Sequence, residues 1–396
     1  MWRPLGVARE EEDNKMRLWR MAAVAGLATS LIIGIAEAGS ASAEMPFLAG
    51  KTVSPNQPST VPTTGAEAGD VNPYGVAVVP ASVGTLHQGA VLVSNFNNSM
   101  NQQGTGSTIM QISPTGQPSI FATISLTAQQ PCPGGVGLTT ALAVFRNGTV
   151  VVGSLPTNGM HAGMSAGEQA GCLIVLNSAG HVVRTISGGP INGPWDMTGA
   201  QFGDDAVLFV TNVLNGLSPT ADPTTVVQEG TVVRLVLDLR TDRVDSETVI
   251  ANDLPERNDP AALVVGPTGV HLGFFGAVLY VASTEDNRIT AVPAPFFLPG
   301  PLFGSGFTVT SGGSLNAPLG LTVAPNGDII TVNGDDGKAV ETAPFGGMQV
   351  ATVQLDNTPV PGLPNGNGTL FGIALTPNGK GLYFVDDGSN TLNLFS

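Results

Sequence analysis

Polar side chains that could do chemistry recur at the ends of six apolar runs. Each run ends in Asn, Ser or Asp, and the six residues are Asn95, Ser154, Asn212, Ser283, Asn333 and Asp387. Their oxygen atoms could coordinate a hard cation such as calcium, or hydrogen-bond to a polar ligand. The same residue types also end strands and start turns, so a purely structural role stays open.

Further candidates lie near recurrent Pro-containing segments. Trp195, together with Tyr74 and Phe371, could form an aromatic mouth that stacks on a ligand, or these rings could pack inside the protein. Asp196 and its counterparts Asn258 and Asp259 could supply oxygen ligands to a divalent cation. The full predicted ligand-binding set is Asn95, Trp195, Asp196, Asn212, Asn258, Asp259, Asn333 and Asp387.

The sequence contains no catalytic motif in the setting that its chemistry needs. Gly163–Gly167 reads G-x-S-x-G, but a nucleophile elbow requires a strand, a turn and a helix, and this segment is a Gly-rich insertion. The acidic stretch Asn333–Gly337 lacks the downstream Glu of an EF-hand. No H-E-x-x-H zinc motif is present, because the histidines occupy unrelated positions; they are His87, His161, His181 and His271. Catalytic residues and metal ligands are therefore left unassigned, and no cofactor is evident, although a divalent cation such as calcium is compatible.

The composition argues for an all-β protein. Of 396 residues, 52 are Gly and 30 are Pro. Helix interiors disfavour Gly by about 1 kcal/mol and Pro by about 3 kcal/mol, so long helices are excluded. Hydrophobic residues make up 42% of the chain, which is enough to bury a sizeable core. We therefore expect a turn-rich, all-β fold.

The charge balance argues against two classes of partner. The formal net charge is −15, and the basic residues are scattered singly along the chain. Such a surface repels the phosphate backbone of nucleic acids and anionic lipid. We expect the partner to be a protein or a small polar ligand, and not a nucleic acid.

The N-terminus reads as a secretory signal. The apolar run Met21–Ala36 follows Arg17 and Arg20 and precedes Ala41–Ala43, a small-residue cleavage pattern. A membrane anchor is the alternative, but the run is shorter than the roughly 18–20 residues that a span needs. We expect cleavage after Ala43, no stable membrane insertion afterwards, and an exported protein that is periplasmic or secreted.

These observations divide the chain into three parts. Residues 1–43 are the predicted signal peptide, and 44–57 are a linker rich in Pro, Ser, Thr and Ala. Residues 58–396 form one folded domain. Its two cysteines, Cys132 and Cys172, favour a disulfide in an oxidising compartment, although two buried thiols are the alternative. Closing a loop of about 40 residues would contribute about 4 kcal/mol to stability.

A motif of Pro, any residue, a small residue and an apolar strand recurs six times. We take its third position as the marker, and the six markers are Gly75, Gly137, Asp196, Ala262, Gly320 and Gly372. Four apolar runs can be read in each repeat, except that the sixth repeat lacks its last run. Six units of four antiparallel strands predict a six-bladed β-propeller. Because the ring must close, we expect a segment near Pro58–Thr64 to supply the missing outer strand as an N-terminal strand.

Two stretches carry a family resemblance. Ser283–Ile289 and Asp387–Leu392 resemble the segment between the second and third strands in NHL-repeat propellers, and the whole resembles SMP-30-like six-bladed propellers of exported bacterial type. The resemblance implies the fold; the fold does not imply an activity. In SMP-30-type lactonases the middle residue of some first-strand entrances is a metal ligand. Here we assign those positions to residues that are not metal ligands, namely Tyr74, Val136, Trp195, Ala261, Leu319 and Phe371.

Three long insertions are expected on one face of the propeller. They are residues 96–107, 155–171 and 213–230, each between the second and third strands of a blade. We therefore expect a binding or interaction module that uses this face, and a non-enzyme more than an enzyme. The alternative is a metal-dependent hydrolase, a lactonase or esterase, that uses Asp196, Asn258 and Asp259.

Overall fold

The computed structural model describes residues 45–65, 67–156, 170–218, 221–260 and 262–396. The predicted signal peptide lies outside these residues, as does the G-x-S-x-G segment. Within the described residues, no helix is long and apolar enough to cross a membrane. Nearly all regular structure is β-strand; one 3-10 turn, η2 (Phe274–Gly276), precedes β15.

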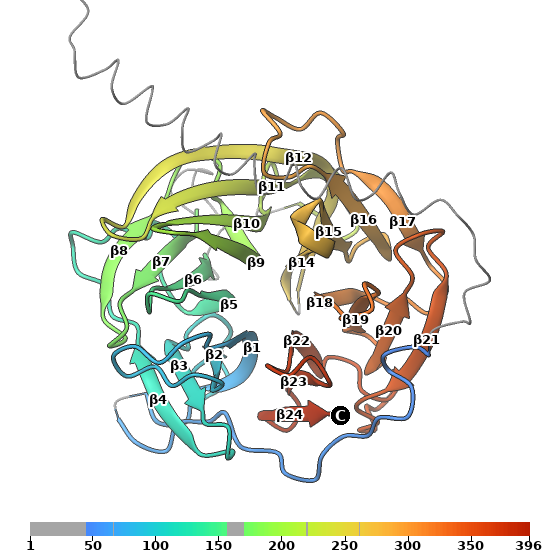
Figure 1. Cartoon of the computed structure of the whole chain (residues 1–396), viewed down its shortest axis with the longest axis horizontal. Coiled ribbons are helices and arrows are strands. Elements are labelled where there is room, and N and C mark those ends of the chain that lie inside the picture. Colours follow the sequence, from blue (N-terminus) through green and yellow to red (C-terminus); the bar gives the residue numbers. More distant parts are fainter. Residues whose placement is uncertain (1–44, 66, 157–169, 219–220, 261) are drawn as a thin grey trace, which may run out of the picture.

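Six antiparallel sheets stand around a central axis, which confirms the six-bladed β-propeller (Figure 1). The strands of the first three blades are β1 (Val71–Val78), β2 (Val91–Asn97), β3 (Thr108–Ile112), β4 (Pro118–Thr123), β5 (Leu138–Val144), β6 (Val150–Leu155), β7 (Cys172–Leu176), β8 (Val182–Ile186), β9 (Gly193–Phe202), β10 (Asp205–Val213), β11 (Val227–Asp238), β12 (Arg243–Asp259) and β13 (Leu263–Val265). Those of the last three are β14 (Pro267–Leu272), β15 (Val278–Ser283), β16 (Arg288–Pro293), β17 (Phe307–Ser311), β18 (Pro318–Val323), β19 (Ile329–Asn333), β20 (Lys338–Thr342), β21 (Gln349–Gln354), β22 (Leu370–Leu375), β23 (Leu382–Asp386) and β24 (Thr391–Phe395).

Burial follows the position of a strand within its blade. The second strands β2 and β19 are buried along their whole length, because neighbouring blades cover both of their faces. The outer strands β4 and β17 are largely exposed. Continuous apolar runs therefore become inner strands, and mixed sequences become the outer edges.

The recurrent glycine has a steric explanation at the axis. A Cβ atom on Gly75 would lie 2.6 Å from the carbonyl oxygen of Thr140 in the next blade, and one on Gly320 would lie 2.2 Å from that of Phe371. The same contact joins Gly269 to Leu319 at 2.2 Å and Gly372 to Tyr74 at 2.0 Å. In these four blades the marker is glycine because the first strand lies against the backbone of the next blade's first strand.

Hydroxyl groups reinforce these contacts between blades. Ser94 Oγ donates to the carbonyl oxygen of Thr139 at 2.8 Å, and Thr211 Oγ1 donates to that of Thr268 at 2.6 Å. Thr284 Oγ1 donates to the carbonyl oxygen of Pro318 at 2.7 Å. Blades one and two, three and four, and four and five are thus joined by buried hydrogen bonds.

Two of the six predicted markers are wrong. The strand pairing aligns Pro73 with Asn95 in blade one and Thr139 with Ser154 in blade two, so the second marker is Ala141 and not Gly137. In blade four Pro267 pairs with Ser283, so the marker is Gly269 and not Ala262. Pro267–Gly269 forms the entrance of β14, and β13, which follows Ala262, pairs with the end of β12 in blade three.

The N-terminal segment closes the ring, as the missing strand predicts. Residues 52–60 run antiparallel to β24, with bridges from Val53 to Phe395 and from Ser59 to Thr391. The blue segment passes along the red strand β24 in Figure 1. The pairing thus starts before Pro58, within the segment 44–57 that we expected to be a linker.

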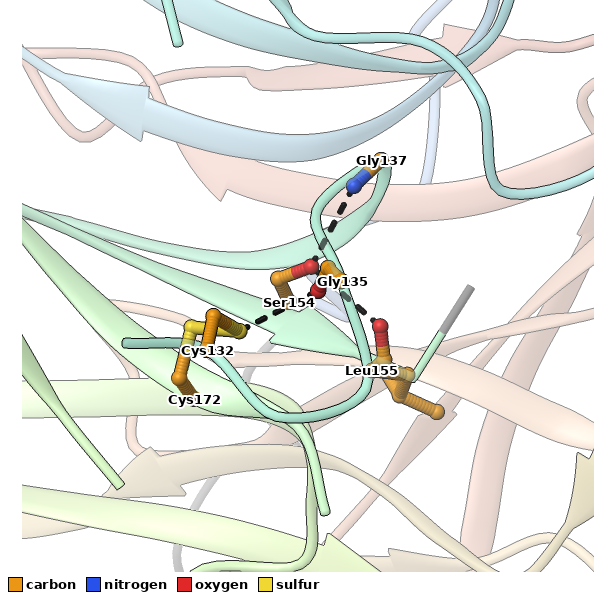
Figure 2. The surroundings of a disulfide bond; sticks show 6 residues. All are labelled: Cys132, Gly135, Gly137, Ser154, Leu155 and Cys172. Atoms are coloured by element: carbon orange, nitrogen blue, oxygen red, sulfur yellow. Dashed lines mark hydrogen bonds between the residues drawn. A yellow bond between two sulfur atoms is a disulfide. The ribbon is translucent and has the colours of Figure 1, made fainter. Parts of the chain in front are cut away.

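The predicted disulfide is confirmed. Cys132, in the loop before β5, is bonded to Cys172, the first residue of β7, across a separation of 40 residues (Figure 2). The bond ties the start of blade two to its third strand. The neighbouring turn is further fixed by Gly137 N, which donates to Ser154 Oγ.

The contact at the axis gives a testable consequence. We expect Gly372→Ala to lower the free energy of unfolding by about 1–3 kcal/mol, because its methyl group would overlap the carbonyl oxygen of Tyr74. Gly300→Ala is the matched control, since no atom lies within 4 Å of its Cβ position. Urea denaturation of both variants measures the difference; equal stabilities would show that blade spacing at the axis tolerates a side chain.

Candidate functional site

A cavity of about 690 Å³ opens at one end of the propeller axis. We call it the upper cavity. All six blades contribute side chains to it, mainly from the first residues of their inner strands and from the turns that follow their second strands. Its floor is aromatic, and part of its wall is charged.

Aromatic rings form the floor of the upper cavity. Tyr74 stacks on Phe371 with ring centroids 4.7 Å apart, and Phe96 meets both rings edge-on. Trp195 Nε1 donates a hydrogen bond to the hydroxyl of Tyr74, which joins blade three to blade one across the axis. Burial raises the pKa of Tyr74 far above its ordinary value, so this hydroxyl stays neutral. The floor offers an apolar surface to a ligand.

A second, smaller space lies along the axis among the first strands. This axial channel has a volume of about 290 Å³ and is lined by Asp196 and His271, neither of which lines the upper cavity. Both oxygens of Asp196 accept backbone N–H groups, from Met197 at 2.8 Å and from Val270 at 3.3 Å. Burial raises the pKa of Asp196 to about 7. Asp196 thus helps to hold blade three against blade four.

The charged wall is centred on an arginine. Arg257 Nη1 lies 2.8 Å from Asp259 Oδ2, and its Nε lies 2.7 Å from Glu285 Oε2. These two partners keep the pKa of Arg257 above its ordinary value despite partial burial. Among the described lining residues Arg257 is the one basic side chain, and it pairs with two of the four carboxyl groups that line the cavity.

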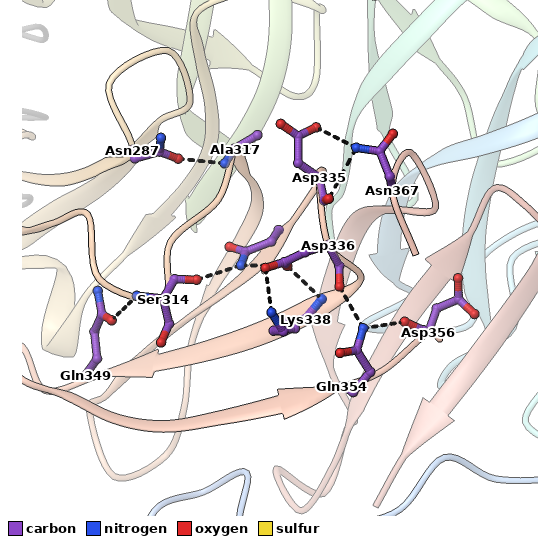
Figure 3. A network of polar contacts seen from close by, with 11 residues as sticks. Asn287, Ser314, Ala317, Asp335, Asp336, Lys338, Gln349, Gln354, Asp356 and Asn367 are labelled. Atoms are coloured by element: carbon purple, nitrogen blue, oxygen red, sulfur yellow. Dashed lines mark hydrogen bonds and ion pairs between the residues drawn. The ribbon is translucent and has the colours of Figure 1, made fainter. Parts of the chain in front are cut away.

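Two further carboxyl groups line the upper cavity from blades five and six. Burial raises the pKa of Asp335, and the negative charges of Asp259 and Asp336 raise it further. Asn367 donates to Asp335 across the cavity rim, while Asp336 is paired with Lys338 below it (Figure 3).

Asp387 is the more strongly perturbed of the two. Burial raises its pKa to about 7, and the adjacent Asp386 adds to the shift. Asn72 Nδ2 donates to Asp387 Oδ1 at 2.6 Å, which opposes the shift but does not cancel it. A carboxyl group in a cavity with a pKa near neutrality can both take and return a proton.

The predicted ligand-binding residues separate into two groups. Trp195, Asp259 and Asp387 line the upper cavity. Asn95 and Asn333 are fully buried; their Nδ2 atoms donate to the carbonyl oxygens of Thr60 and Ser314.

Two more of the predicted residues organise loops. Asn212 Oδ1 accepts from the backbone N–H groups of Asn192 and Gly193. Asn258 Nδ2 donates to the carbonyl oxygens of Ser218 and Ala221. These asparagines do not line the upper cavity. Their hydrogen bonds are structural, which is the alternative that the sequence left open.

Several lining residues were not singled out from the sequence. Arg257 adjoins Asn258, Asp335 lies two residues after Asn333, and Glu285 lies inside the NHL-like stretch. Asn72 lies two residues before Tyr74. Nothing in the local sequence marks these four residues as members of one cavity. The insertions contribute less than expected. Residues 96–107 provide part of the wall, whereas no described residue of 213–230 lines it, and residues 157–169 lie outside the described part.

The positions that hold metal ligands in the resembling lactonases do not fit a metal here. In the observed register these positions are Tyr74, Thr140, Trp195, Thr268, Leu319 and Phe371, so Thr140 and Thr268 replace the predicted Val136 and Ala261. Among the described residues, no group of three or more His, Cys, Asp or Glu side chains could hold a metal ion. We therefore derive no reaction step through a metal, and a calcium ion stays an expectation from the sequence.

Comparisons with known proteins find similar folds only. A scan against protein-family models gives no match, and neither does a search of the curated proteins. Among solved structures, a protein assigned as a gluconolactonase is 17% identical, with 89% of this chain and 93% of that chain covered and a TM-score of 0.49. A gluconolactonase from Xanthomonas campestris is 15% identical, with 87% and 96% covered and a TM-score of 0.49. At these identities and TM-scores, neither structure decides between the two functions expected from the sequence.

The raised pKa of Asp387 predicts a pH-dependent stability. Its folded-state pKa is about 7 and its ordinary value is 3.8, so the stabilising effect of the neutral acid is complete below about pH 4 and is lost as pH rises through 7. Asp387→Asn stays neutral at every pH. We expect this variant to match the wild type at pH 4 and to exceed it at pH 8 by on the order of 2 kcal/mol. Urea denaturation at both pH values measures this, and a variant that is less stable at pH 8 would contradict it.

Proposed function

We propose that this protein hydrolyses a small ester or lactone in the upper cavity. The observation that carries the proposal is the carboxyl group of Asp387, which lines a cavity of about 690 Å³ and has a pKa of about 7. A general base works best when its pKa is close to the working pH. The cavity also combines an apolar floor with polar walls, as small-molecule sites do.

The residues of the cavity support a simple acid–base reaction. A water molecule attacks the carbonyl carbon of the ester while the ionised Asp387 takes one of its protons. The tetrahedral intermediate then collapses, the bond to the alcohol oxygen breaks, and Asp387 returns the proton to that oxygen. One water is consumed, and an acid and an alcohol form. The carboxylate ends in its starting state.

The other lining residues have distinct parts in this reaction. Arg257 is held in place by Asp259 and Glu285, so its positive charge is fixed beside the cavity and would stabilise the negative charge that develops on the carbonyl oxygen. The rings of Tyr74 and Phe371 would bind the apolar part of the substrate and keep bulk water from the floor.

A second candidate is a small-ligand binding protein that performs no reaction. The aromatic and apolar side chains at the first-strand entrances favour this candidate, because such side chains can stack on a ligand. None of these side chains is a carboxylate that could hold a metal ion. A small polar ligand would then occupy the same cavity. The compartment proposed from the sequence is periplasmic or extracellular, and the Cys132–Cys172 disulfide supports an oxidising one.

Hydrolysis assays test the proposal. We expect the mature protein to hydrolyse at least one of 4-nitrophenyl acetate, 4-nitrophenyl butyrate, γ-butyrolactone and glucono-δ-lactone. Its kcat/KM should rise with pH to a plateau above about 7. Asp387→Asn should lower kcat/KM by at least about 100-fold. Asp222→Asn is the control, because Asp222 is exposed and does not line the upper cavity. Equal rates with EDTA and with added calcium are expected.

Fluorescence separates the two candidates. Trp195 is the one tryptophan beyond residue 43, and it lies in the cavity floor, so a bound ligand should change its emission. Emission changes without hydrolysis of any probe would favour the binding protein. No hydrolysis and no emission change with any of the four probes would reject both uses of this cavity for such compounds.

A further inference from the structure

A buried amide oxygen beside Asp387 has no partner within the described residues. Asn72 is 9% exposed and lines the upper cavity. Its Nδ2 donates to Asp387 Oδ1 at 2.6 Å, but its Oδ1 accepts no hydrogen bond. Leaving a buried acceptor unsatisfied costs about 1–3 kcal/mol, and native structures rarely do so. The partner of this oxygen must therefore come from the cavity.

The backbone holds Asn72 firmly in this position. Its φ of 63° is left-handed, a conformation that Asn tolerates better than most residues. Its backbone N–H donates to Asn390 Oδ1 at 2.7 Å, which ties the start of β1 to the turn between β23 and β24. Asn72 is thus fixed at the junction of blades one and six, with its amide plane set by Asp387.

The missing partner must donate a hydrogen bond to Asn72 Oδ1, and the neighbouring Asp387 offers it a second acceptor. Asn72 Oδ1 can only accept, and an ionised Asp387 can only accept as well. The described groups that act on Asp387 are Asn72 and the carboxylate of Asp386, and neither can donate to Asn72 Oδ1. A water molecule has two protons and can donate one to each acceptor.

We propose that Asn72 Oδ1 and the carboxylate of Asp387 together hold the water that attacks the substrate. Asn72 is then a positioning residue and Asp387 the base. One proton of the water points to Asp387, the other to Asn72, and a lone pair of the water oxygen is left to face the ester carbon. This inference rests on the proposed hydrolysis. Fixing the water in this orientation lowers the entropy cost of the attack.

Two variants of Asn72 test the inference through kinetics. Asn72→Gly suits the left-handed backbone and removes both polar atoms. We expect kcat on the best ester probe to fall at least tenfold and KM to stay within twofold, because the group acts on water and not on substrate. The inflection of the pH–kcat curve should move upward, since Asp387 loses the amide donor that favours its ionised form. Asn72→Asp keeps the acceptor oxygen and loses the donor, so it should retain more activity than Asn72→Gly at high pH.

The matched control is Asp242→Gly. Asp242 also has a left-handed backbone, with φ 54°, but lies in the distant turn between β11 and β12. Its kinetics should equal those of the wild type. A raised KM with unchanged kcat in Asn72→Gly would show that Asn72 binds substrate, and unchanged kinetics would show that it has no part in the reaction; both overturn the inference while the proposed hydrolysis stands.

A structural readout keeps the inference testable if none of the probes is hydrolysed. A high-resolution crystal structure of the wild type should show a water within hydrogen-bond distance of both Asn72 Oδ1 and Asp387, and Asn72→Gly should lack it. A wild-type structure with no water there overturns the inference whatever the activity. A bridging water in a protein inactive on every probe would support the water site and reject the proposed reaction on these compounds.

Discussion

The close approach of neighbouring first strands at the axis is the constraint on which the rest of the structure depends. Where Gly75, Gly269, Gly320 and Gly372 lie, the backbone of the next blade comes within contact distance of the position that a Cβ would take. In these four blades the marker must be glycine-sized, whereas blade three accommodates Asp196 at the same position. The residue just before the marker then lies at the end of the axis, and these preceding residues include Tyr74, Trp195 and Phe371, which form the cavity floor.

Ring closure brings the ends of the propeller chain into the candidate site. Residues 52–60 complete the sheet of blade six at its outer edge. At the inner edge Asn72, at the start of blade one, bonds to Asn390 and Asp387 of blade six. The strongest acid–base candidate and its amide partner are therefore 315 residues apart in sequence but adjacent in space. Closure and the proposed chemistry depend on the same junction.

The repeats could be predicted from the sequence because Pro and Gly fix local backbone geometry. Blade number and ring closure follow from that pattern, the disulfide follows from the pair of cysteines, and all three are confirmed. The registers of blades two and four could not be predicted, because Gly137 and Ala262 stand before apolar runs just as the true markers do. What distinguishes Ala141 and Gly269 is their strand pairing across the blade, which is a tertiary property.

The candidate site was predictable only in part, for a similar reason. Asp259, Trp195 and Asp387 stand next to recognisable strand ends or entrances. Asn95 and Asn212 have the same local signature, yet their polar atoms are used by backbone partners from other loops. A sequence shows that a side chain is polar, but it does not show whether the fold has already satisfied its hydrogen bonds.

The apolar entrance positions also explain how an acid–base site can arise without a cluster of metal ligands. Tyr74, Trp195 and Phe371 occupy first-strand entrances, some of which hold metal ligands in SMP-30-type lactonases, and they give this end of the axis an apolar surface. Burial is the largest cause of the raised pKa of Asp387. In the proposed reaction, desolvation therefore gives the protein a base that works near neutral pH, whereas a metal would act by making its bound water more acidic. The rings at these entrance positions line the same cavity as the carboxyl group of Asp387.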